Sequence, residues 1–173
     1  MITLRELADQ IREVNIAHGW RDDDTSWDDL IALLHTEISE CVGHWRVRRL
    51  ASYVTATGKP DDVAAELADA VIRLLDMCDV HGEVAFDMDC ELADVASRAP
   101  ERELLTFGAW ISWLHAQADR MWEHPGNAPI FLRAVVTAAR RFHIDLEKAV
   151  LLKLEYNRTR PFQHGGTIGG SLP

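Results

Sequence analysis

Cysteine is scarce in this chain, which has three cysteines among 173 residues. Cys41, Cys78 and Cys90 form no CxxC motif, and an odd number of thiols cannot all pair with one another. We therefore expect neither a disulfide framework nor a structural zinc site, and the thiols suit a reducing compartment. The first residues also lack the apolar core and cleavage site of a secretory signal, so we expect a cytoplasmic protein.

Long apolar runs and an excess of basic charge are missing as well. No stretch approaches the roughly 18 to 20 consecutive apolar residues of a membrane helix, so we expect no membrane partner. The chain has 18 Lys and Arg residues against 28 Asp and Glu residues, for a formal net charge of -10. This charge repels phosphate backbones and argues against a nucleic-acid partner. A small anionic ligand would need metal ions as a bridge.

Alternating strand patterns with hairpin turns are also absent, whereas helical periodicity recurs almost throughout. The sequence therefore predicts one all-α domain over residues 1–173, long enough to bury a sizeable core. The predicted helices cover 4–18, 28–45, 60–81, 88–97, 101–122, 128–143 and 145–157. Gly19, Gly58 and Pro100 fall between them, and the glycine-rich tail at 161–173 is predicted to be flexible.

Two acidic pairs are the candidates for chemistry. Glu37 and Glu40, and likewise Glu66 and Asp69, are three residues apart, so each pair can point from one helical turn into one space. If the two pairs face each other, they form a cage of four carboxylates. Hard divalent cations such as Mg²⁺, with Mn²⁺ as a substitute, prefer such oxygen ligands and keep positions open for substrate phosphates.

Spacing alone does not single out these pairs, because most acidic residues are exposed. Three other pairs share it: Glu6/Asp9, Asp76/Asp79 and Glu91/Asp94. Position around the helix is more informative, since Glu37 and Glu66 lie at the margins of the apolar stripes, and His44 and Arg73 extend the same two stripes. Carboxylates directed into a cleft and salt bridges at a helix boundary both fit this placement.

The surroundings of these pairs resemble the MazG-like nucleotide pyrophosphohydrolases. Residues 34–40, Leu-His-Thr-Glu-Ile-Ser-Glu, followed by Trp45 and Arg46, are similar to the first ExxE helix of that family. Residues 66–76 resemble its ExxD helix. Residues 144–149, Ile-Asp-Leu-Glu-Lys-Ala, then lead through Lys153 and Asn157 to an ending at 160–166 that is similar to the basic, HGG-type tail of some members.

The resemblance implies a function and a set of site residues. It implies an all-α bundle of the MazG-like type, dependence on Mg²⁺, a homodimer or homotetramer, and cleavage of (deoxy)nucleoside triphosphates to monophosphates and pyrophosphate. Carried over by position, the metal ligands and catalytic residues are Glu37, Glu40, Glu66 and Asp69. The substrate-binding candidates are Lys153, Asn157, Arg160 and Arg73. The arginines suit phosphates, although a solvated charge cluster explains Arg160 equally well.

Two departures from the family pattern stand out. His35 and Thr36 occupy positions where members often carry a further acid, and residues 83–142 form a probable helical insertion before the segment at 144–149. The insertion could reshape the pocket, replace a subunit contact or add a binding surface. We expect Trp110, Trp113 and Trp122 within it to lie in the core or at an oligomer interface.

Several other residues are weaker candidates. Asp76 lies on the same helix face as Asp69 and Arg73 and is a candidate for an accessory acid. Glu91 and Asp94 belong to a near repeat of residues 66–70, but an acidic pair of this kind is usually exposed to solvent. The tryptophans at 20, 27 and 45 could stack on a base, but core packing is favoured.

A rival interpretation is a catalytically silent helical protein that recognises a nucleotide or a protein partner. A carboxylate-bridged iron protein would require Glu-x-x-His signatures, and the sequence has none.

Overall fold

The structure is a computed structural model that describes residues 2–21, 24–82, 87–95 and 106–162. These residues form seven α-helices and no strand beyond isolated bridges, which confirms the all-α prediction. No helix in the described ranges is both long enough and apolar enough to cross a membrane. The tail predicted to be flexible lies outside the described residues from position 163 onward.

Side-chain caps set the start of most of the helices. α1 (Leu4–Ala17) follows Thr3, which forms a capping box with Glu6, and α2 (Trp27–Arg48) follows Ser26. The starts of the other capped helices follow the same rule: α3 (Val63–His81) after Asp62, α5 (Phe107–Glu123) after Thr106, and α7 (Leu146–Arg158) after Asp145. The remaining elements are α4 (Leu92–Val95), a 3-10 turn η2 (Pro125–Asn127) and α6 (Ala128–Arg141).

Three predicted boundaries are wrong. α3 starts at Val63 rather than at Pro60, because Pro60 bridges Val54 and the side chain of Asp62 accepts the N–H of Ala65. Of the helix predicted at 88–97, the described residues keep only α4. The carbonyls of residues 88 and 90 instead accept the N–H groups of residues 5 and 4 at the start of α1, both at 2.9 Å. The helix predicted at 128–143 ends at Arg141, shortly before a positive φ of 56° at residue 143.

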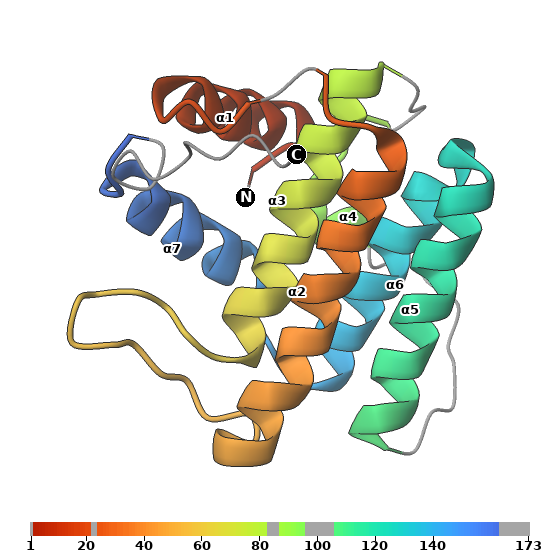
Figure 1. Cartoon of the computed structure of the whole chain (residues 1–173). Coiled ribbons are helices and arrows are strands. Elements are labelled where there is room, and N and C mark those ends of the chain that lie inside the picture. The colour runs from red at the N-terminus through yellow and green to blue at the C-terminus, as the bar shows by residue number, and fades with distance from the viewer. Residues whose placement is uncertain (1, 22–23, 83–86, 96–105, 163–173) are drawn as a thin grey trace, which may run out of the picture.

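Helices α2 and α3 pack against each other at the centre of the molecule (Figure 1). α5 and α6 pack on one side of this pair, where α5 contacts α2 and α6 contacts α3. α1 and α7 lie on the other side and contact α3 and each other. α3 is therefore enclosed on both sides, and most of its residues are buried.

The insertion contributes directly to the hydrophobic core. Trp110 and Leu114 of α5 are fully buried, and Phe107 stacks on Trp45 of α2 with ring centroids 4.9 Å apart. Trp122 differs from the other tryptophans of α5, because 53% of it is exposed and its Nε1 donates to Asp28 Oδ1 at 2.6 Å. The described part of 83–142 thus completes the core formed by α2 and α3.

Candidate functional site

A polar cavity of about 990 Å³ lies on the side of α2 and α3 that faces α1 and α7. All eight site residues predicted from the sequence line it: Glu37, Glu40, Glu66, Asp69, Arg73, Lys153, Asn157 and Arg160. Among the described residues, α4, α5 and α6 contribute nothing to its walls. The described part of the insertion therefore packs on the side of α2 and α3 that faces away from this cavity and does not line it.

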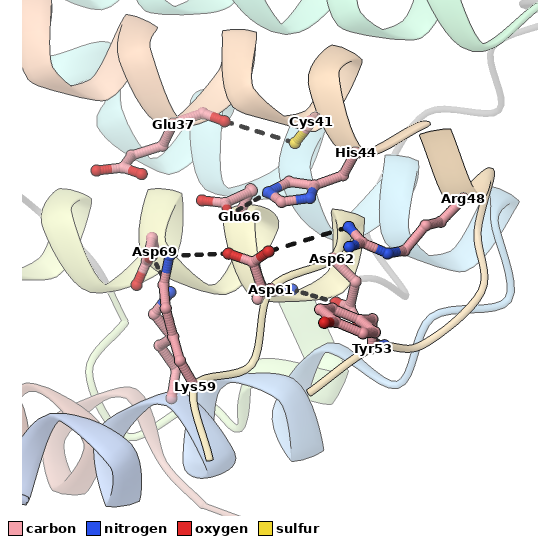
Figure 2. A network of polar contacts seen from close by, with 12 residues as sticks. Glu37, Cys41, His44, Arg48, Tyr53, Lys59, Asp61, Asp62, Glu66 and Asp69 are labelled. Atoms are coloured by element: carbon pink, nitrogen blue, oxygen red, sulfur yellow. Dashed lines mark hydrogen bonds and ion pairs between the residues drawn. The ribbon is translucent and has the colours of Figure 1, made fainter. Parts of the chain in front are cut away.

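The register between α2 and α3 brings the two acidic pairs face to face. Arg73 of α3 donates to Glu37 Oε1 near one end of the contact. Near the other end, His44 Nε2 of α2 lies 2.9 Å from Glu66 Oε1 (Figure 2). Because the helices are antiparallel, residues midway between these contacts must also meet, which places Glu40 opposite the turn that carries Asp69.

Three of the four carboxylates gather closely enough to share one cation. Glu37, Glu40 and Glu66 each offer an oxygen, and these oxygens lie within 4.8 Å of one another. Two of the three side chains are buried, whereas Glu40 is exposed toward the cavity. An all-oxygen donor set that is open on one side fits Mg²⁺ or Mn²⁺, which keep some water or phosphate ligands.

Burial makes Glu66 an unusual acid. Only 1% of the residue is exposed, and desolvation raises its pKa to about 8. Lys153 opposes this rise, while the neighbouring carboxylates add to it. A divalent cation bound beside Glu66 would supply the positive charge that the ionised form needs.

Asp69 forms an ion pair with a buried lysine side chain. Lys153 Nζ lies 2.5 Å from Asp69 Oδ2, and Lys153 is 4% exposed. Burial raises the pKa of Asp69, and Lys153 opposes the rise by its charge and its hydrogen bond. Of the four carboxylates predicted to form a cage, Glu37, Glu40 and Glu66 cluster together, and Asp69 lies outside this cluster and is paired with Lys153.

The loop before α3 adds groups to the site that the sequence did not single out. Lys59 lines the cavity and binds Asp61 Oδ1 at 2.9 Å. Asp61 also lies 4.0 Å from Arg48, and together with His44 and Glu66 it forms a second group of nearby metal-ligating atoms (Figure 2). Lys59 and Arg48 already neutralise the charge of Asp61. This second group therefore has less need of a metal ion than the cluster of three glutamates.

The opposite end of the cavity is formed by α1, the segment after it and α7. Trp20 stacks on His18 with centroids 4.7 Å apart, and the guanidinium of Arg160 lies 4.8 Å from the Trp20 ring. Arg160 therefore lines the cavity as predicted but lies beside an aromatic ring. Asp76 lines this end as well, in agreement with its predicted place on the face of Asp69 and Arg73.

Other candidates lie elsewhere. Glu91 bridges Thr3 and Asp94 is exposed on α4, and neither lines the cavity. Trp27 packs edge-on against His81, and Trp45 packs in the core, as favoured from the sequence. The HGG motif at 164–166 lies outside the described residues.

Comparisons with known proteins add no identification. No family model, curated protein or solved structure matches this chain.

Proposed function

We propose that this protein is a Mg²⁺-dependent nucleotide pyrophosphohydrolase of the MazG-like type, which cleaves a nucleoside triphosphate to a monophosphate and pyrophosphate. The observation that carries the proposal is the convergence of all eight predicted residues on one cavity. These residues belong to three motifs far apart in the sequence, and nothing in the separation of the motifs requires them to meet. A boundary salt-bridge pattern would not need a cavity of this size beside it.

Charge distribution in the cavity supports an anionic substrate that arrives with a cation. Glu37, Glu40 and Glu66 form the acidic cluster, and basic side chains stand around it. The basic residues that line the cavity are Arg21, Lys59, Arg73, Lys153 and Arg160. In a chain of formal net charge -10, such a gathering of cations at one cavity suits phosphate groups.

The proposed roles follow from burial and pairing. Glu37 and Glu66 would hold the cation from the buried wall, and Glu40 would complete the set from the open side. A bound Mg²⁺ would supply charge neutralisation for the phosphates and acidify the attacking water. Glu40 has no ion pair to a described residue, so its carboxylate is also available to accept a proton from that water.

Lys59 and Arg73 are placed to contact phosphates on opposite sides of the acidic cluster. Both are partly exposed, at 41% and 40% of their side chains, and each is held by one carboxylate, Asp61 and Glu37 respectively. Their partners fix where the cationic groups sit while leaving N–H groups free to face the cavity. This arrangement would orient the triphosphate before reaction.

A binding role without turnover is the second candidate, because a specific observation favours it. Glu37 and Asp69 are already neutralised by Arg73 and Lys153. With two of the four carboxylates neutralised, the cavity could accept an anionic nucleotide without any metal. Nucleotide binding that is unaffected by a chelator would support this alternative.

Pyrophosphate release separates the two candidates. The assay uses a panel of ribo- and deoxyribonucleoside triphosphates with Mg²⁺ or Mn²⁺, and a chelator control. Glu40→Gln is the informative variant, because its exposed side chain can change without disturbing the core; Glu13→Gln, also exposed on α1, is the matched control. We expect metal-dependent release that E40Q lowers by about 100-fold or more and E13Q leaves intact. Folded wild-type protein that binds nucleotides but releases no pyrophosphate would contradict the hydrolase.

We also propose a homodimer or homotetramer in the cytoplasm, as the family resemblance implies. Light scattering of the purified chain, with and without Mg²⁺, tests the assembly.

A further inference from the structure

The cavity continues well beyond the acidic cluster. Glu66, Asp69, Arg73 and Asp76 form one stripe along α3, and all four line the cavity. Glu66 and Asp76 are ten positions apart, which corresponds to a rise of about 15 Å along the helix axis. The end near Asp76 is therefore a separate region, away from the place where phosphates would meet a cation.

Two buried acceptors lack partners at this end. Asp76 Oδ1 and Asn157 Oδ1 are buried atoms with no hydrogen bond to any described residue. Asn157 is 7% exposed and lines the same cavity from α7. Leaving a buried acceptor unpaired is unfavourable, so such groups call for a donor. Two of them in one cavity indicate a ligand that supplies N–H or O–H groups.

The surroundings of Asp76 leave one of its two carboxylate oxygens without a hydrogen-bond partner. Asn15 of α1, which is 9% exposed, favours the ionised form of the Asp76 carboxylate, against the effect of burial on its pKa. Oδ1 of this carboxylate is buried and has no hydrogen-bond partner among the described residues. The nearby Arg21 is bound to Asp79 at 2.5 Å. Oδ1 is thus a buried acceptor that the described residues leave unpaired.

The walls around these acceptors suit a flat heterocycle. Leu33 and Ile72 contribute apolar surface, and Trp20 and Tyr156 contribute aromatic surface to the same cavity. Pockets of this kind bind ring systems through apolar contact and use a few polar atoms for orientation and selection. A carboxylate acceptor among such walls pairs with an amino group and is repelled by a carbonyl oxygen.

From these contacts we infer that Asp76 is the specificity residue of a nucleobase subsite, and that it selects bases with an exocyclic amino group over their oxo counterparts. The inference rests on the proposed nucleotide function, because it assigns the base of that nucleotide to the Asp76 end. Asn157 Oδ1 accepts a second donor from the same ligand. Cytosine and adenine are favoured, and uracil and hypoxanthine are disfavoured.

Binding of mononucleotides tests this subsite without any turnover. Full-length protein is titrated calorimetrically with dCMP and dUMP, and with AMP and IMP, two pairs that exchange an amino group for an oxo group. We expect the amino member of each pair to bind about tenfold or more tightly. N6,N6-dimethyl-AMP, whose exocyclic nitrogen has no N–H, should bind as weakly as IMP.

Asp76→Asn reverses the chemistry of the acceptor. The amide of this variant can place its NH₂ group at the position of Oδ1, where it donates to a carbonyl oxygen instead of accepting from an amino group. D76N should therefore lose or invert the preference in both pairs, whereas Asp94→Asn, an exposed change on α4, should keep it. Equal wild-type affinities within both pairs, no binding of any mononucleotide, or a folded D76N with the wild-type preference would overturn the subsite. Selective binding without pyrophosphate release would leave the subsite standing and overturn the hydrolase alone.

Discussion

His44 Nε2 lies 2.9 Å from Glu66 Oε1 and joins the C-terminal half of α2 to the first turn of α3. An imidazole N–H that donates to a carboxylate stabilises its ionised form. Since a cation requires the ionised form, His44 should favour metal binding without touching the metal.

We predict that His44→Ala weakens Mn²⁺ or Mg²⁺ binding at pH 7 by about tenfold, the size of a hydrogen bond to a charged group. His44→Gln, which can still donate, should recover part of the loss. Isothermal titration measures the affinity, with His124→Ala, an exposed histidine, as the control. A metal affinity that is the same in wild type and H44A across pH 6–9 would contradict this role.

The metal-free protein should become less stable as the pH rises toward 8. The folded state holds the pKa of Glu66 at about 8, above its ordinary value of 4.5, so between these values the folded state binds more protons than the unfolded state. The contribution to the free energy of unfolding is complete below pH 4.5 and is lost progressively up to pH 8, by at most about 1.4 kcal/mol per pH unit.

Glu66→Gln removes this titration and tests its source. We expect the difference in the free energy of unfolding between E66Q and wild type to move in favour of E66Q as the pH rises from 5 to 8. Urea unfolding in the presence of a chelator measures it. Mg²⁺ should stabilise wild type more at pH 8 than at pH 6, because the cation replaces a proton, and should leave E66Q unaffected. A pH-independent difference between the two proteins would argue against the shift.

Removing one partner of the ion pair between Lys153 and Asp69 should lower the free energy of unfolding. Lys153→Met leaves a largely buried carboxylate without its cation, and we expect the free energy of unfolding to fall by about 3 kcal/mol. The double change Lys153→Met with Asp69→Asn should recover most of this loss, because no lone charge remains. Lys148→Met, exposed on the same helix, serves as the control. Additive losses in the double variant would mean that the pair is not coupled.

Trp110 tests whether the insertion is structural. Trp110→Ala should lower the free energy of unfolding by about 3–5 kcal/mol, because the ring is 2% exposed and leaves a large cavity. The folded fraction should keep its nucleotide affinity, since Trp110 lies on the side of α2 and α3 away from the polar cavity. Trp122→Ala, at an exposed position, should change stability little. A loss of nucleotide affinity in folded W110A would place the insertion in the site.

Local signals in the sequence were sufficient for most of the helices and for both acidic stripes. Glu37 and Glu66 were predictable because the helical repeat is regular. A residue at the edge of the apolar stripe in the sequence therefore lies at the edge of the buried face in the structure. The extensions of those stripes, His44 and Arg73, each contact a carboxylate of the opposite acidic pair, which was not predicted. Periodicity alone could not tell that the two margins enclose a cavity.

Residues that reach the site through a loop were missed. Lys59 stands in a Gly-Lys-Pro sequence that signals only a chain break, and its direction depends on the path of the loop before α3. The helix predicted at 88–97 failed for a related reason, since the backbone there pairs with the start of α1. Both outcomes depend on contacts between distant segments, and no local pattern encodes them.

The enclosure of α3 has a consequence for how this chain can vary. A helix on the surface has one face on which substitutions are nearly free, but α3 has core on one side and the polar cavity on the other. Even its alanines at 65, 68 and 70 are at most 2% exposed, so a larger side chain there has no space to occupy. We expect a saturation mutagenesis library selected for folded protein to tolerate fewer replacements across residues 63–78 than across α1 or α7. Among descendants of this sequence, α3 should then be the segment that diverges most slowly.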